Sequence, residues 1–160
     1  MRNTAQAALS PLDQELETWA SDAGYGSPKS VPAGSSGWAS FRKVTTADPP
    51  RDDAGRPVSF FVKSSSRSCA DMFEGEALGL AALHACSRGS ADALRIPQVY
   101  HYGDYSDGKG SLLVMQYLNL AGRSDERALG RAMARLHLAP PTEEAGNPTK
   151  AFGFPVDNTM

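Results

Sequence analysis

Residues 58–77 read VSFFVKSSSRSCADMFEGEA, and the spacing of apolar residues in this stretch is first typical of a strand and then of a helix. From Val58 to Lys63, apolar side chains recur at every second position, as in a half-buried strand. Ser68 then lies three residues before Asp71, which resembles a capping box, and apolar residues recur after it at helical spacing. The stretch therefore predicts a strand, a short loop, and a helix that runs to about residue 88.

Glu76 is an acidic residue on the apolar face of the predicted helix, three residues after Phe73 and four before Leu80. A buried carboxylate is costly unless it is paired, and the upstream candidate partner is Lys63 at the end of the predicted strand. A strand that ends in lysine, followed by a helix with an inward glutamate, describes a protein-kinase-like N-lobe, where the pair holds the lysine against the α and β phosphates of ATP. Spacing alone leaves a second interpretation open, in which Lys63 snorkels at the strand end and Glu76 lies on the helix flank.

The segments before this stretch predict a helix and a further strand. A Ser-Pro pair at residues 10–11 has the order of an N-cap and a first helical residue, and the apolar pattern after it continues until Gly24. Residues 24–37 are rich in Gly, Ser and Pro and predict a loop. Residues 38–45 offer the aromatic and β-branched side chains of a strand, and residues 47–55 predict a solvated connection.

The segments after the predicted helix indicate a strand hairpin and a last helix. Residues 96–102 and 111–117 are strand-like, and residues 103–110 join them. This loop nearly matches a phosphate-binding P-loop, but Gly110 replaces the Ser or Thr that would bind magnesium and a strand follows, so we interpret it as a hairpin turn. Ser124 is the predicted cap of a helix whose apolar face carries Leu129, Met133 and Leu136. This order of elements, with few crossovers, predicts an α+β lobe with an antiparallel sheet.

Length and composition limit the class of protein. The 160 residues fit one domain or one lobe, and 41% hydrophobic residues are enough to form a core. A net charge of -2 does not create the cationic field that nucleic acid or an acidic membrane requires, so we expect neither partner. The longest nearly apolar run, residues 78–86, is far shorter than the roughly 20 residues that cross a bilayer. The N-terminus has neither a secretion signal nor an acid-poor transit peptide, so we expect a cytoplasmic protein of undetermined oligomeric state.

The cysteines and histidines do not form a recognisable chemical site. Cys69 and Cys86 lie on the predicted helix about 25 Å apart at about 1.5 Å per residue, which is beyond disulfide reach. The three histidines have no second ligand at metal spacing, so we expect no zinc site. The sequence also contains no Gly-x-Ser-x-Gly elbow, which disfavours a hydrolase of that kind.

Residues 33–37 read Ala-Gly-Ser-Ser-Gly and precede a predicted strand. Small residues let backbone amides approach phosphate groups closely, as a nucleotide-covering loop requires. Because the stretch is not a full Gly-x-Gly-x-x-Gly pattern, an ordinary flexible loop remains the alternative.

Residues 61–63 read Phe-Val-Lys and residues 72–77 read Met-Phe-Glu-Gly-Glu-Ala, and together these motifs resemble the fructosamine-3-kinase (ketosamine-3-kinase) family. Further matches occur in the same order, so that the resemblance covers roughly residues 30 to 160. They are Ile96-Pro97, residues 113–115, residues 129–137, residues 152–154 and residues 156–159.

The resemblance implies a kinase-like fold shared with aminoglycoside phosphotransferases, and an enzyme that uses ATP and Mg²⁺ to phosphorylate the 3-hydroxyl of sugars attached to amines. Its substrates would be glycated proteins or small ketosamines, and the unstable product releases the amine. By the same resemblance Lys63 would bind the ATP phosphates and Glu76 would orient Lys63. The other implied nucleotide-site residues are Gly34, Ser35, Ser36 and Gly37 in the phosphate cover, Phe61 in the pocket wall, the gatekeeper Met115, and Gln116, Tyr117 and Leu118 in the adenine hinge.

The sequence departs from the family pattern in two places. The family's catalytic His-Gly-Asp-Leu segment and later metal-binding aspartate have no counterpart here, so we expect no catalytic residue, no magnesium ligand and no turnover from this chain alone. Ser35-Ser36 also replaces a cover loop that is more glycine-rich and often contains cysteine.

The predicted organisation is a helix over residues 1–23, an N-lobe over residues 24–118, and the beginning of a C-lobe over residues 119–160. Two alternatives to a ketosamine kinase remain open. One is a noncatalytic module that binds nucleotide or a protein partner. The other is part of a small-molecule kinase that acts on an aminoglycoside or a choline-like alcohol.

Overall fold

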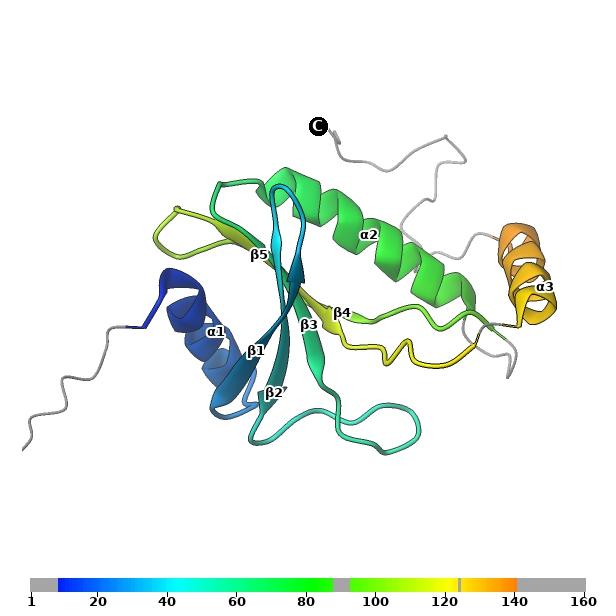
Figure 1. The fold of residues 1–160 in the computed structure, drawn as a ribbon, viewed down its shortest axis with the longest axis horizontal. Coiled ribbons are helices and arrows are strands. Elements are labelled where there is room, and N and C mark those ends of the chain that lie inside the picture. Colours follow the sequence, from blue (N-terminus) through cyan, green and yellow to red (C-terminus); the bar gives the residue numbers. More distant parts are fainter. Residues whose placement is uncertain (1–8, 88–92, 124, 141–160) are drawn as a thin grey trace, which may run out of the picture.

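The computed structural model describes residues 9–87, 93–123 and 125–140. Within them, five antiparallel strands form one sheet in the order β1-β2-β3-β5-β4, with helices packed against it (Figure 1). This arrangement confirms the predicted α+β class. The elements are α1 (Pro11–Asp22), β1 (Pro28–Ser35), β2 (Ser40–Thr46), β3 (Phe60–Ser65), α2 (Ala70–Ser87), β4 (Val99–Asp104), β5 (Ser111–Gln116) and α3 (Glu126–Leu138).

Side chains alternate between the two faces of the sheet along each strand, so both faces carry apolar residues. A helix covers each face, α1 one and α2 the other. On one face, Trp19 of α1 meets the buried Phe60 of β3 edge-on, with ring centroids 4.9 Å apart. On the other face, Phe73 of α2 packs in a second buried cluster with Leu113 of β5. Lys63 belongs to this second face, since it pairs with Leu113 in the β3–β5 register. α2 therefore lies over the face of the sheet that carries the lysine.

The predicted first helix is confirmed as α1. Ser10 is its N-cap and accepts a 3.2 Å hydrogen bond from the amide of Asp13, while Pro11 occupies the first turn. The helix ends at the C-cap Ala23, and Gly24 follows with a φ of 72°. That left-handed conformation is one that glycine adopts without steric cost.

The prediction of a loop over residues 24–37 is wrong for most of that stretch, because β1 occupies it from Pro28 to Ser35. β1 is one of the two edge strands and, among the described residues, pairs with β2 alone, so its prolines lie where a missing N–H can face away from the sheet. Most of its residues are exposed, which removes the alternating hydrophobic pattern that marks a half-buried strand. The register shifts between Pro32 and Gly34, where Gly34 has a φ of 125°.

The start of α2 differs from the predicted capping box. The helix begins at Ala70, and the Ser68 hydroxyl donates a 2.6 Å hydrogen bond to the Asp104 carboxylate of β4 instead. The amide of Cys69 donates to the buried Ser111 hydroxyl at 2.7 Å, and that hydroxyl in turn bonds Asp104. Hydrogen bonds from Ser111 and Ser68, together with those from the backbone of Cys69 and Ala70, hold the pKa of Asp104 below its usual value. The β4–β5 hairpin, rather than a local box, therefore holds the N-terminal end of α2.

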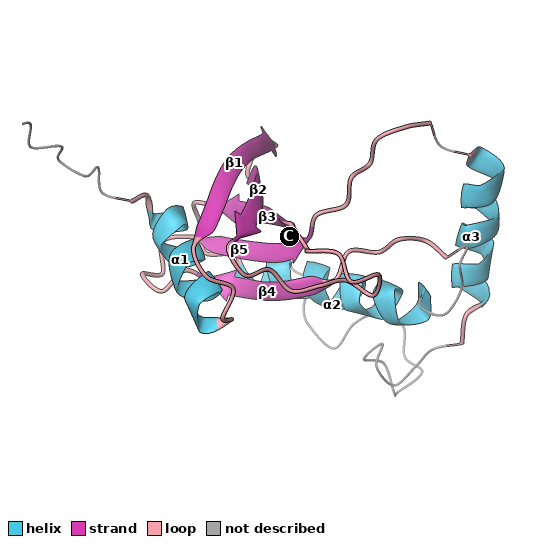
Figure 2. Cartoon of the chain, turned by 90° about the horizontal axis from the view of Figure 1, so that it is seen from below, coloured by secondary structure: helices cyan, strands magenta, loops and turns pink. Residues whose placement is uncertain are grey.

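α3 confirms the helix predicted after residue 124, but its cap is Asp125 rather than the predicted Ser124, which lies outside the described residues. The Asp125 carboxylate accepts hydrogen bonds of 3.0 Å from two amides of the first turn. Leu129 and Met133, on the predicted apolar face, are 48% and 41% exposed. α3 lies beyond the C-terminal end of α2, away from the sheet (Figure 2).

The remaining fold predictions concern the hairpin turn, the cysteines and membrane or metal features. Residues 105–110 close a turn between β4 and β5, with the Tyr105 amide bonded to the Gly110 carbonyl at 2.8 Å, which confirms the hairpin interpretation. Cys69 and Cys86 are free cysteines that form no disulfide with each other, and both are partly buried. In the described part of the chain, no helix is long and apolar enough to cross a membrane, and no cluster of three potential metal ligands occurs.

Candidate functional site

The central contact of the site is the ion pair between Lys63 and Glu76. Lys63 Nζ of β3 donates a hydrogen bond of 2.6 Å to Glu76 Oε2 of α2. Their side chains are 18% and 34% exposed, so the pair is partly shielded from water. The structure therefore confirms that Glu76 points inward to Lys63, and the alternative in which Lys63 snorkels at the strand end and Glu76 lies on the helix flank is wrong.

Two aromatic rings surround the Lys63 ammonium, and neither was predicted as a site residue. Its nitrogen lies 4.8 Å from the centroid of the Trp38 ring and 5.7 Å from that of Phe73. The two rings are themselves neighbours, 5.9 Å apart. Phe73 could have been inferred, since it lies one helical turn before Glu76. Trp38 carries no comparable pattern, because its position depends on how the hairpin folds against α2.

The predicted phosphate cover, Gly34 to Gly37, lies at the end of β1 and in the turn to β2. The turn is closed by a 2.8 Å bond from the Ser36 amide to the Ala39 carbonyl and by a 3.2 Å bond from the Ala39 amide to the Ser36 hydroxyl. The turn end of the hairpin is joined to β3 through the hydroxyls of Ser40 and Ser64, 2.8 Å apart. A cavity of about 560 Å³ lies between this turn, the end of β3 and the start of α2.

The predicted pocket wall lies on the same sheet face as Lys63. Phe61 pairs with Met115 of β5 and packs against Phe41 of β2, with ring centroids 5.5 Å apart. Lys43, which was not predicted, pairs with Phe61 and places its ammonium 4.5 Å from the ring centroid of Tyr117. The structure thus brings Phe61, Met115 and Tyr117 onto the lysine-bearing side of the sheet.

The predicted hinge begins at Gln116, the last residue of β5, and two of its amides already have partners. The Gln116 amide donates to the Gln98 carbonyl at 2.7 Å, and the Tyr117 amide donates to the Ser59 carbonyl at 2.8 Å. These bonds fix the chain as it leaves the sheet toward Leu118. The hinge is therefore an ordered strand exit rather than a loose connection.

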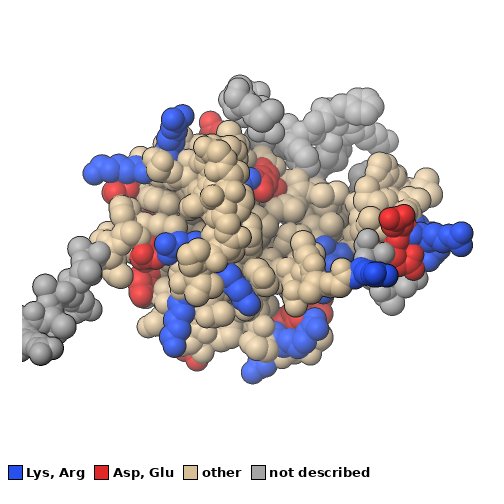
Figure 3. Space-filling model, in the orientation of Figure 1, with Lys and Arg blue, Asp and Glu red and all other residues tan. Residues whose placement is uncertain are grey.

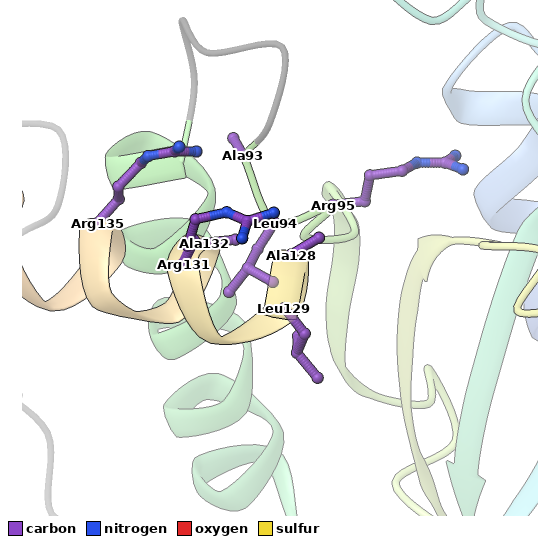
Figure 4. Close-up of a pocket in the computed structure, with 8 residues that line it drawn as sticks. All are labelled: Ala93, Leu94, Arg95, Ala128, Leu129, Arg131, Ala132 and Arg135. Carbon is purple, nitrogen blue, oxygen red and sulfur yellow. The ribbon is translucent and has the colours of Figure 1, made fainter. Parts of the chain in front are cut away.

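Charges of both signs are interspersed over the surface in the view of Figure 3. A separate pocket of about 270 Å³ lies between α3 and the segment before β4, and three arginines line it. In Figure 4 the side chain of Arg95 extends away from those of Arg131 and Arg135. The guanidinium groups do not converge on one point, so this pocket lacks the geometry of a single anion site.

Comparison with known proteins bears directly on these motifs. The family model described as fructosamine kinase matches residues 52–160, which include Lys63, Glu76 and the hinge. A protein of Oryza sativa subsp. indica named protein-ribulosamine 3-kinase, chloroplastic, is 37% identical over 118 residues, or 73% of this chain and 30% of that protein. A protein of Arabidopsis thaliana with the same name is 38% identical over 109 residues, covering 68% of this chain and 29% of its own length.

This chain spans about 30% of the length of these curated relatives. Among solved structures, a thermostable mutant of an aminoglycoside phosphotransferase, in a ternary complex with AMP-PNP and hygromycin B, aligns with a TM-score of 0.46 and 14% identity. The alignment covers 69% of this chain and 30% of that one.

Proposed function

The chain belongs to the fructosamine kinase family, and we propose that it forms the nucleotide-binding part of a kinase that phosphorylates the 3-hydroxyl of protein-bound ketosamines. The observation that carries the proposal is the Lys63–Glu76 pair at 2.6 Å, on the same sheet face as Phe61 and in contact with Trp38 of the hairpin turn. The relatives' printed name supports ribulosamine as the sugar adduct. The family's description, fructosamine kinase, supports fructosamine as a related acceptor, which we propose is used on proteins or as a small ketosamine.

In this proposal, Lys63 holds the α and β phosphates of ATP, and Glu76 holds Lys63. A lysine is a flexible point charge, so an acceptor at 2.6 Å restricts where its ammonium can lie. The backbone of Gly34 to Gly37 covers the phosphates, because glycine and serine leave room for close approach. Substrate phosphates then meet a cation whose position is set before they arrive.

The adenine is proposed to lie against Phe61, with Met115 as the gatekeeper behind it. Two hinge amides, those of Gln116 and Tyr117, already donate within the fold. We therefore assign the hydrogen bonds to adenine to the remaining polar backbone groups of the hinge, around Leu118. An apolar wall with a few directed polar groups is the usual form of a cofactor pocket.

Phosphoryl transfer also requires groups that these residues do not contain. A bound Mg²⁺ ion would neutralise phosphate charge, and a base would accept the proton of the attacking hydroxyl. The family's His-Gly-Asp-Leu segment and metal-binding aspartate have no match in the sequence. We therefore assign nucleotide binding to this chain and expect no turnover from it alone.

The proposed reaction moves the γ-phosphoryl group from ATP to the sugar. The bond between the γ-phosphorus and the β–γ bridging oxygen breaks, a bond to the 3-oxygen of the ketosamine forms, and ADP leaves with the bridging oxygen. The hydroxyl proton passes to the base. The relatives are named as chloroplastic, and the cytoplasmic location expected for this chain remains a prediction.

Transfer of radiolabel from γ-labelled ATP to a ribulose-glycated protein tests the substrate class, with the full-length protein that contains these residues. We expect label on the glycated protein and none on the same protein after borohydride has reduced its ketone groups. Equal labelling of both, or labelling of an aminoglycoside or of choline in their place, would contradict the proposed acceptor.

A further inference from the structure

Trp38 lies at the tip of the β1–β2 hairpin and covers the cation of the proposed phosphate site. Its ring centroid is 4.8 Å from Lys63 Nζ, within the distance at which an ammonium is attracted to an aromatic face. The ring also packs against Phe73 of α2, 5.9 Å away. The hairpin tip thus contacts both the strand and the helix that form the ion pair.

The Trp38 ring contacts the Lys63 ammonium, the same cation that we propose binds the nucleotide phosphates. Lys63 has three N–H donors, and Glu76 accepts a hydrogen bond from its ammonium. The indole covers a further part of the ammonium, and a phosphate that bonds Lys63 competes with the ring for the space beside the remaining donors. A charge-assisted bond to phosphate is stronger than a partly exposed cation–π contact, so the ligand displaces the ring.

The hairpin holds Trp38 in place without burying it. The turn is closed by the Ser36–Ala39 bonds, and the Ser40–Ser64 contact joins the first residue of β2, directly after the turn, to β3. Trp38 nevertheless remains 47% exposed. The side chain can therefore swing off the ammonium into solvent, a movement that gives up its contact with Phe73, a member of one buried cluster to which Trp38 itself does not belong.

We propose that Trp38 is a gate for the nucleotide phosphates, with its indole covering Lys63 in the ligand-free protein and moving away when a di- or triphosphate binds. The gate rests on the proposed nucleotide binding. The indole competes with any ligand group that must reach the Lys63 ammonium, so it weakens the binding of ligands that carry phosphate. A ligand with the same base and sugar but without phosphate does not compete with the indole.

The first test compares ADP and adenosine binding to the parent chain, Trp38→Leu and Trp38→Phe by titration calorimetry. Leucine removes the aromatic face and keeps an apolar side chain, while phenylalanine retains a weaker face. We expect Trp38→Leu to bind ADP about 2–5-fold more tightly than the parent, since an exposed cation–π contact has an energy of about 0.5–1 kcal/mol. Trp38→Phe should lie between the two, and adenosine affinity should not change.

Unchanged or weaker ADP binding by Trp38→Leu would overturn the gate while leaving nucleotide binding intact. An equal gain for adenosine would also overturn it, because the effect would then not involve phosphate. If neither the parent nor Trp38→Leu binds ADP, the proposed function fails and the gate fails with it. Matching thermal unfolding curves of the parent and the variants show that the comparison concerns binding and not folding.

A second test follows the indole itself. The chain has two tryptophans, and Trp19 is 7% exposed in the core against Phe60. The fluorescence of the parent minus that of Trp38→Leu therefore reports on Trp38. We expect this difference spectrum to shift to longer wavelength as ADP or inorganic tripolyphosphate is added, because the ring moves into water. A difference spectrum that stays unchanged at saturating ADP would contradict the proposed movement.

Discussion

The ion pair between Lys63 and Glu76 gives the most quantitative prediction. At 2.6 Å and an effective dielectric constant of about 20, the Coulomb attraction is about 6 kcal/mol before any cost is counted. Loss of hydration and of side-chain freedom offsets most of this attraction. Exposed fractions of 18% and 34% place the pair between surface pairs of about 0.2–1 kcal/mol and buried pairs, whose disruption costs about 3–5 kcal/mol.

We therefore expect a coupling free energy of about 1–2 kcal/mol between Lys63 and Glu76 in a double-mutant cycle. The cycle uses Lys63→Met, Glu76→Gln and the double variant, which remove each charge while keeping an unbranched side chain of similar size. Urea unfolding followed by far-UV circular dichroism gives the four free energies of unfolding. Circular dichroism is preferable to fluorescence because Trp38 lies against Lys63 and would report the substitution directly.

Salt provides an internal control for the cycle. The side chains are partly exposed, so raising the ionic strength should reduce the coupling without abolishing it. A coupling within about 0.3 kcal/mol of zero at low salt, below the scatter expected for independent sites, would refute the inference that this contact stabilises the lobe.

Three further predictions concern the packing and the pH response of the lobe. Phe73→Ala should lower the free energy of unfolding by about 3–5 kcal/mol, because the ring is fully buried, and a loss below 1 kcal/mol would contradict that packing. The pKa of Asp104 is lowered on folding, so the stabilisation that Asp104 contributes is present above its unfolded pKa and is lost as pH falls through the lower folded value. Asp104→Asn should flatten this part of a profile of unfolding free energy against pH. An unaltered profile would argue against the hydrogen bonds of Asp104 at the start of α2. Burial lowers the pKa of His101 and so favours the neutral ring in the folded protein. The free energy of unfolding should therefore fall as pH drops through about 6.5, the unfolded pKa, and on to the lower folded pKa. His101→Gln should weaken this fall, and a pH profile identical to that of the parent would exclude the effect.

Local periodicity was enough to predict most elements of the sheet and the partner of Lys63. Alternation and helical spacing lie within residues 58–77, and both elements of the ion pair come from that one stretch. A carboxylate on an apolar helical face requires a cationic side chain as its partner, because burying it unpaired is costly. The pair is therefore a case in which local pattern and tertiary contact agree.

The missed features depend on contacts between distant segments. β1 has the composition of a loop, and it is a strand because β2 supplies its hydrogen-bond partners at the sheet edge. The N-terminal end of α2 is bonded by Asp104, which lies 36 residues after Ser68 in the chain. Trp38 reaches Lys63 only because the hairpin folds toward α2. No short-range pattern encodes these three placements.

The clearest measurement is a calorimetric titration of ADP into the parent chain, Lys63→Met and the matched variant Lys29→Met, whose lysine is exposed on the edge strand β1. A charge-assisted contact to phosphate contributes about 1.5–3 kcal/mol, so Lys63→Met should weaken ADP binding by about 10–100-fold. Lys29→Met should bind ADP like the parent. Equal affinities in all three proteins would contradict the assignment of Lys63 to the nucleotide phosphates.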